Sequence, residues 1–142
     1  MNRKIRKVLL INPPSTRPGD YSQEKCRISV FVPLGLAYIA AVIEQEGYNV
    51  KILDSLLEGI NNGEQQYGNN MLRYGLSDSE LEEIISREAP DIIGISCLYS
   101  NKDWDMRNSA KIAKSVFPAC PVVVGGVHPT AIARELLEEE KK

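Results

Sequence analysis

Short runs of mainly apolar residues set the strongest limit on how this chain can fold. A strand with one solvated face alternates apolar and polar residues, whereas these runs are largely continuous, which is typical of strands buried on both faces. Segments with helical spacing separate the runs, as they do in parallel sheets. The predicted strands are Val8–Ile11, Asn49–Asp54, Ile92–Ser96 and Val122–Val124.

Helix signals lie between these strands. Pro33 stands where proline commonly opens a helix, and Gly47 ends the same segment. The run Ser77-Asp78-Ser79-Glu80 has the pattern of a capping box, and the helix behind it ends at Ala89-Pro90. The two remaining helices are expected over 103–116 and from near Pro129.

This alternation predicts an α/β fold with a flavodoxin-like (Rossmann-like) parallel sheet in the order 2-1-3-4. Such folds usually carry a fifth strand, which is missing here, so we expect residues 1–142 to be the N-terminal part of a longer protein. Strand four would then form an open edge that invites self-association. We expect a long loop over 15–32, and over 58–75 either a surface insertion or a flap above a ligand.

Composition and charge exclude several classes of partner. Seventeen Lys and Arg against nineteen Asp and Glu give a net charge of −2, which argues against nucleic acid and anionic membranes. The first apolar run is too short for a secretory signal or a membrane span, so we expect a cytoplasmic protein. The scattered Cys26, Cys97 and Cys120, with one histidine, favour neither a disulfide framework nor a protein-built metal site.

Two small-residue motifs follow buried strands at the edge where ligands bind in open parallel sheets. Ser96-Cys97-Leu98 ends the third strand, and Gly125-Gly126 ends the fourth. Glycines allow a ligand to approach the backbone closely, and the Ser96 hydroxyl is able to hydrogen bond. Taken singly, the glycines also suit a tight turn and the serine a helix cap. The combination predicts a ligand site at this edge.

The order and spacing of these motifs resemble a cobalamin-binding fold. Ser96-x-Leu98 precedes Gly125-Gly126 by twenty-six residues, as the S-x-L and G-G halves of that fold would. The frame around them, Val8 to Pro14, Pro33 to Ala40, Pro90 to Ser96 and Gly125 to Thr130, covers nearly the whole chain. It is similar to the N-terminal B12-binding domain of cobalamin-dependent radical SAM enzymes, nearest the group of the magnesium-protoporphyrin IX monomethyl ester oxidative cyclase.

This resemblance implies that the corrin ring rests on the carboxyl edge and that its nucleotide tail passes between sheet and helices. Ser96 would hydrogen bond to the benzimidazole or its linker, Leu98 would form an apolar wall, and Gly125 and Gly126 would form the tail passage. The lower face of the ring, the face that carries the tail, would be covered by two loops. Their residues are Asn12, Pro13 and Pro14 after the first strand, and Tyr99, Ser100 and Asn101 after the third.

The chain departs from the family pattern at the cobalt ligand. Domains that ligate cobalt carry Asp-x-His-x-x-Gly after the first strand, and Asn12-Pro13-Pro14-Ser15 stands there instead. We therefore expect base-off cobalamin without a histidine ligand. The single histidine, His128, follows the fourth strand and either contacts the tail or is a polar residue at a helix start.

The radical chemistry implied by the resemblance lies outside this chain. A radical SAM domain would bind S-adenosylmethionine and a [4Fe-4S] cluster through Cys-x-x-x-Cys-x-x-Cys, a spacing absent from these residues. We therefore assign no catalytic or metal-ligating residue here. Cobalamin would serve a radical SAM domain of the same parent chain in methyl transfer or oxidative cyclisation, and Cys97 is expected to be a small buried thiol.

Other functions of this topology lack their chemical groups. A receiver domain needs clustered acids after strand one and an Asp after strand three, and a dinucleotide site needs G-x-G-x-x-G; neither pattern is present. The remaining alternative is a degenerate B12 fold that binds no cofactor and serves as a docking module.

Overall fold

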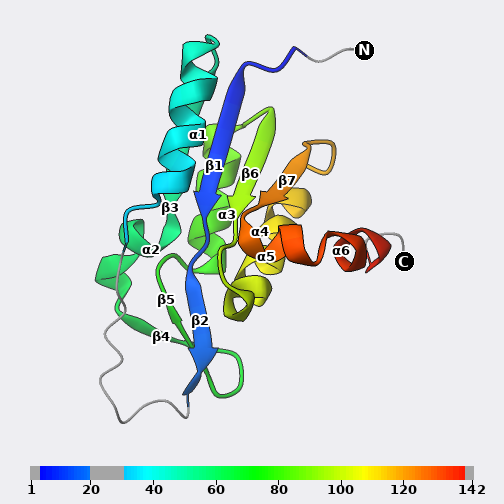
Figure 1. The fold of residues 1–142 in the computed structure, drawn as a ribbon. Coiled ribbons are helices and arrows are strands. Elements are labelled where there is room, and N and C mark those ends of the chain that lie inside the picture. The colour runs from blue at the N-terminus through cyan, green and yellow to red at the C-terminus, as the bar shows by residue number, and fades with distance from the viewer. Residues whose placement is uncertain (1–3, 20–30, 140–142) are drawn as a thin grey trace.

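A parallel sheet forms the centre of the molecule (Figure 1). The computed structural model describes residues 4–19 and 31–139. The sheet has the order β3-β1-β6-β7, and all neighbours are parallel. This confirms the predicted order 2-1-3-4 and the flavodoxin-like class. Its strands are β1 (Lys7–Asn12), β3 (Asn49–Asp54), β6 (Ile92–Ser96) and β7 (Val122–Gly125).

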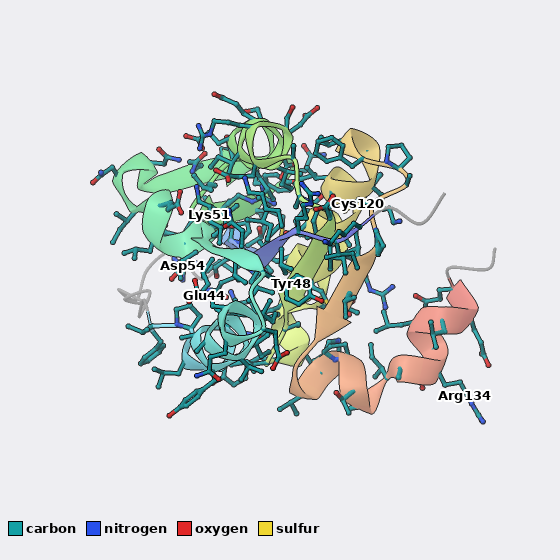
Figure 2. All side chains as sticks on the ribbon, turned by 90° about the horizontal axis from the view of Figure 1, so that it is seen from above. Glu44, Tyr48, Lys51, Asp54, Cys120 and Arg134 are labelled. Carbon is teal, nitrogen blue, oxygen red and sulfur yellow. The ribbon has the colours of Figure 1, made fainter. Side chains whose placement is uncertain are left out.

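Helices cover the two faces of this sheet unequally. Figure 2, seen along the sheet from above, places α1 on one face and α3 and α4 on the other. No helix in the described ranges combines the length and apolar character needed to cross a membrane. The helices are α1 (Leu34–Gln45), α2 (Ser55–Glu58), α3 (Asp78–Glu88), α4 (Asp103–Val116), α5 (Val127–Ala131) and α6 (Ala133–Glu139), with 3-10 turns η2 (Ile60–Asn62) and η3 (Ser100–Lys102).

The local signals in the sequence act as expected at most helix ends. The Ser77 hydroxyl accepts from the Glu80 amide at 3.3 Å, and the Glu80 carboxylate accepts from the Ser77 amide at 2.8 Å, so the capping box forms. Gly47 follows α1 with φ +85°. The last helix differs slightly, because it begins at Val127 with Pro129 in its first turn and is interrupted at Ile132.

Alternate side chains of the strands supply two cores. Leu9, Ile11, Ile93 and Ile95 are directed to the face covered by α3 and α4, where the larger core lies. On the opposite face, a smaller core joins α1 to β1 and β3 through four buried residues. They are Val8, Leu10, Leu36 and Ala40. Burial on both faces thus explains the continuous apolar run of β1, whereas β7, at the edge of the sheet, leaves Val123 exposed.

A second, antiparallel sheet lies beyond the carboxyl edge of the first (Figure 1), and the sequence analysis missed it. Its order is β2-β5-β4, formed by β2 (Ser15–Pro18), β5 (Met71–Tyr74) and β4 (Glu64–Tyr67). The prediction of a loop was therefore wrong for 15–18, and much of 58–75 is regular structure. Residues 20–30, with Cys26, lie outside the described ranges. Strands of only four residues, of which β2 and β4 are mostly polar, carry little local signal, and the pairing of β2 with β5 joins segments far apart in the chain.

The strand β7 lies at one edge of the parallel sheet, and within the described ranges its strand neighbour is β6. Its Val123 is 58% exposed. We predict that free edge groups on β7 allow two copies to pair, and that Val123→Lys weakens this pairing because a lysine on an edge strand opposes it. Sedimentation velocity over a range of concentrations measures the effect. Val127→Lys, which adds the same charge on α5, is the control, and a monomer at every concentration would contradict the prediction.

An ion-pair group at the amino edge ties α3 to the sheet. The Glu88 carboxylate lies 2.6 Å from Nζ of Lys51 and 2.9 Å from Nζ of Lys7. These hydrogen bonds lower the pKa of Glu88 from 4.5 to about 2. A carboxyl whose pKa is lower in the folded state stabilises the protein above its unfolded pKa and loses this effect as pH falls.

We therefore predict that the free-energy difference between wild type and Glu88→Gln is largest above pH 4.5 and shrinks as the pH falls toward 2. Urea unfolding at several pH values measures this difference. Glu82→Gln, on the exposed side of α3, is the matched control. A wild-type advantage that stays constant over this pH interval would refute the role of Glu88.

Candidate functional site

One transverse row of polar and small residues crosses the carboxyl edge of the parallel sheet. Asp54 of β3 is in register with Asn12 of β1, and Ser96 of β6 is in register with Gly125 of β7. Since Ile11 pairs with Ile95, Asn12 and Ser96 are the next residues on their neighbouring strands. The Asn12 amide donates to Oδ1 of Asp54 at 2.9 Å. Parallel pairing therefore brings three of the predicted site residues, Asn12, Ser96 and Gly125, to one line.

Gly126 is required by the backbone itself. Its φ is +114°, and a Cβ there would lie 2.4 Å from the carbonyl oxygen of Cys97. The Cys97 amide donates to the Gly125 carbonyl at 2.8 Å, and the Cys97 carbonyl accepts from the His128 amide at 3.3 Å. The chain that leaves β6 and the turn after β7 are thus in direct backbone contact. A tight turn accounts for this glycine with or without a ligand.

Gly125 differs from its neighbour. Its φ lies outside the left-handed region, and a Cβ there would meet no heavy atom within 4 Å. Neither backbone conformation nor packing therefore demands glycine at this position. The space beside Gly125, at the end of β7 and next to Ser96, is the kind of cradle that a ligand occupies and a side chain would fill.

The site continues down the α1 side of the sheet. Gly94 and Ser96 of β6 and Val123 and Gly125 of β7 are directed to this face, because paired neighbours in a sheet share a face and side chains alternate along a strand. Three of these four residues are small, and Val123 is exposed. We call these four residues the β6–β7 face. Its residues belong to neither of the two buried cores.

A flank of α1 borders the β6–β7 face. Leu36 and Ala40 pack on β1 and β3. In Figure 1, α1 runs back from the carboxyl edge, and β6 lies on the other side of β1 from β3. Because the helix is right-handed, Gly35 and Ile39, one position before Leu36 and Ala40, lie on the flank toward β6. Ile39 is exposed, and a Cβ at Gly35 would meet no heavy atom. The sequence analysis missed this flank. Glycine is unfavourable within a helix, so Gly35 near the start of α1 was a signal that a small residue is needed there for another reason.

The loop after β6 presents exposed side chains at the same edge. Leu98 is 57% exposed, and Tyr99, Ser100 and Asn101 are also exposed around the turn η3. Leu98 thus offers an apolar surface outside the core. On the other side of the edge, Pro14 is buried and Pro13 half-buried.

Cys97 directly precedes these exposed residues, but its side chain turns inward. Its thiol is buried and lies 3.4 Å from the carbonyl oxygen of Tyr99. Burial raises the pKa of the Cys97 thiol, which keeps it protonated. This confirms the expected small buried thiol. Among residues 4–19 and 31–139, no group of three or more His, Cys, Asp or Glu side chains is arranged to hold a metal ion.

His128 is engaged with the protein. Its Nε2 lies 2.7 Å from Oδ1 of Asp103, and its side chain is 9% exposed. Asp103 also accepts from Nε of Arg107 at 2.6 Å. Burial raises the pKa of the Asp103 carboxyl, but the hydrogen bonds from His128 and Arg107 outweigh burial and leave that pKa below its ordinary value. His128 therefore joins α5 to the first turn of α4.

Comparisons with known proteins assign this architecture. The B12 binding domain family matches residues 26–142. The cytidylyl-2-hydroxyethylphosphonate methyltransferase of Streptomyces wedmorensis is 38% identical over 138 residues, 96% of this chain and 25% of that protein. An uncharacterized methyltransferase of Pyrococcus horikoshii is 33% identical over 127 residues, 89% of this chain and 23% of that protein. The chain thus spans about a quarter of the length of each relative. No solved structure matches it.

The family match covers both strands that carry the Ser96 and Gly125 positions and the loops that follow them. It agrees with the parallel sheet, with its strand order and with the small residues at its carboxyl edge. The chain belongs to the B12-binding domain family.

Proposed function

We propose that the domain binds cobalamin, with the corrin ring on the carboxyl edge and the nucleotide tail along the β6–β7 face. The observation that carries this proposal is the open space beside Gly125, which no packing or backbone requirement explains. Ser96 is the hydrogen-bonding group next to that space, and the flank of α1 with Gly35 and Ile39 forms its side wall. The residues present therefore fit the cofactor implied by the family.

The bound cofactor is base-off and has no histidine ligand in this proposal. Asn12, Pro13 and Pro14 offer no imidazole after β1, and Asn12 uses its amide on Asp54. His128 lies after β7 and directs Nε2 to Asp103, so in this proposal it anchors α5 and does not ligate cobalt. The His128 amide donates to the Cys97 carbonyl, which keeps the start of α5 beside the β6–β7 face. Tyr99, Ser100 and Asn101 then cover the ring from the loop after β6.

The domain presents this cofactor to a catalytic domain of a longer parent chain. Bound cobalamin supplies methyl or electron transfer at its cobalt, while the protein supplies position and environment. Both relatives are named methyltransferases, which favours methyl transfer over oxidative cyclisation. The partner we propose is a radical SAM domain with S-adenosylmethionine and a [4Fe-4S] cluster, whose cysteine ligands this chain does not contain.

The second candidate is a docking module that binds no cofactor. Gly126 favours neither candidate, because the close contact with the Cys97 backbone by itself explains why a glycine stands there. A retention test separates the two. The protein is incubated with hydroxocobalamin and desalted, and the visible spectrum of the protein fraction is recorded. Retained cobalamin at one equivalent supports the first candidate, and a colourless protein supports the second.

Gly125→Val tests the tail passage. We predict that the valine side chain fills the open space and raises the Kd for cobalamin about tenfold or more, equivalent to about 1.4 kcal/mol. The fold should persist, because a Cβ at Gly125 meets no neighbour. Gly126→Val does not test this point, since it collides with Cys97.

The control for this experiment is Ala119→Val, a similar enlargement at an exposed position beyond the opposite end of β7. Titration followed by absorbance measures Kd, and circular dichroism monitors the fold. An unchanged Kd for a folded Gly125→Val protein would refute the tail passage.

His128→Ala tests the absence of a histidine ligand. We predict that bound cobalamin keeps its base-off spectrum, because the imidazole is held by Asp103 and not by cobalt. The variant should lose some stability as α5 is released from α4. Absorbance and electron paramagnetic resonance of the Co(II) form measure the ligand. Loss of a nitrogen-ligand signal that wild type displays would show His128 to be the axial ligand.

A further inference from the structure

Buried polar contacts join the two loops that flank the candidate site. The Thr16 amide, on β2 after the loop 13–14, donates to Oδ2 of Asp105 at 3.0 Å. One residue earlier, the Ser15 hydroxyl contacts Nζ of Lys102. Lys102 and Asp105 belong to η3 and the first turn of α4, directly after the exposed loop of β6. Side chains of the segment after β6 therefore hold the segment after β1 at two successive residues.

Thr16 is also held from the opposite direction. Its hydroxyl accepts from Nε of Arg73 at 3.2 Å, and Arg73 forms an ion pair with Asp78 at the start of α3. The Arg73 guanidinium lies 3.9 Å from the centre of the Tyr67 ring. Amide and hydroxyl of Thr16 are thus both bonded to buried charged groups from other elements. We call Thr16, Ser15, Asp105 and Lys102 the loop clamp.

Burying the charged groups of the loop clamp costs free energy of desolvation. Asp105 and Arg73 are each 1% exposed, and burial raises the pKa of Asp105 and lowers that of Lys102. Oδ1 of Asp105 and Nη2 of Arg73 have no hydrogen-bond partner among the described residues. Apolar side chains would stabilise such a junction at least as well, whereas directed polar contacts select one geometry. These contacts therefore suit a protein in which the loop after β1 must keep a defined position relative to the loop after β6.

We propose that Asp105 and Lys102 are positioning residues that hold the loop after β1 against the loop after β6, so that together they close the lower face of the bound corrin to axial ligands. This inference rests on the proposed binding of cobalamin. In a domain with no histidine after β1, that face is shielded by the residues of these two loops, and shielding requires that the two loops do not separate. Asp105 acts through Thr16, and Lys102 acts through Ser15.

The test measures access of imidazole to cobalt in the Co(II) form of bound cobalamin. Electron paramagnetic resonance reports nitrogen ligation directly and does not depend on catalytic activity. We expect wild type to resist added imidazole, and Asp105→Ala to show nitrogen ligation at an imidazole concentration about tenfold lower. Asp105→Asn should behave nearly as wild type, because its amide oxygen still accepts from Thr16.

Two further variants make the result decisive. Leu81→Ala removes a fully buried side chain of the large core, away from the clamp, and controls for general destabilisation. Lys102→Met keeps the length of the side chain but lacks the ammonium group, so it provides the test if Asp105→Ala does not fold. Imidazole access in Lys102→Met should then exceed that in wild type.

Each outcome bears on one claim. Equal imidazole access in wild type and a folded clamp variant, or equal access in Leu81→Ala and Asp105→Ala, overturns the positioning role while cobalamin binding stands. Failure of the wild-type protein to retain cobalamin overturns the proposed function and the positioning role with it. Ligation at lower imidazole in the clamp variants alone, with rescue by Asp105→Asn, supports the proposal.

Discussion

The close backbone contact between Gly126 and Cys97 is the constraint on which the candidate site depends. Parallel pairing of β6 and β7 brings Ser96 and Gly125 into register, and the turn at Gly126 then returns the chain across Cys97. Only a residue without Cβ permits that approach. The same turn directs α5 and His128 toward α4. The path of the chain from β7 into α5 therefore depends on one glycine.

The two glycines of the pair have different physical roles. Gly126 is explained by geometry within the protein, and Gly125 is not. A short sequence motif thus combines a glycine that the backbone requires with a glycine that neither the backbone nor the packing requires, and in our proposal the small size of Gly125 serves the bound cofactor. This distinction separates the part of the motif that any tight turn shares from the part that indicates a ligand.

The second sheet changes how the carboxyl edge is built. Here β2 continues the loop after β1 into an antiparallel sheet, and Thr16 connects that sheet to Asp105 of α4 and Arg73 of β5. His128 and Asp103 connect the loop after β7 to the same first turn of α4. That turn of α4 thus orders loops from three strands around the candidate site.

The sequence alone determined the parallel sheet, its strand order, most helix boundaries and the edge at which Ser96 and Gly125 lie. These features rest on local signals, namely apolar runs, the capping box at Ser77 and the glycine after α1, which act over a few residues. The family resemblance added the cofactor class, and the family match supports it.

Only the tertiary structure decided the antiparallel sheet, the flank of α1 beside the β6–β7 face, the loop clamp and the partner of His128. Each of these joins segments distant in the chain: Thr16 meets Asp105, and Asp103 meets His128. The contacts that surround the buried Asp105 carboxylate, and the atom that the His128 imidazole faces, depend on groups that only folding brings together. No local pattern encodes such a pairing, because its energy arises only when both partners are already in place.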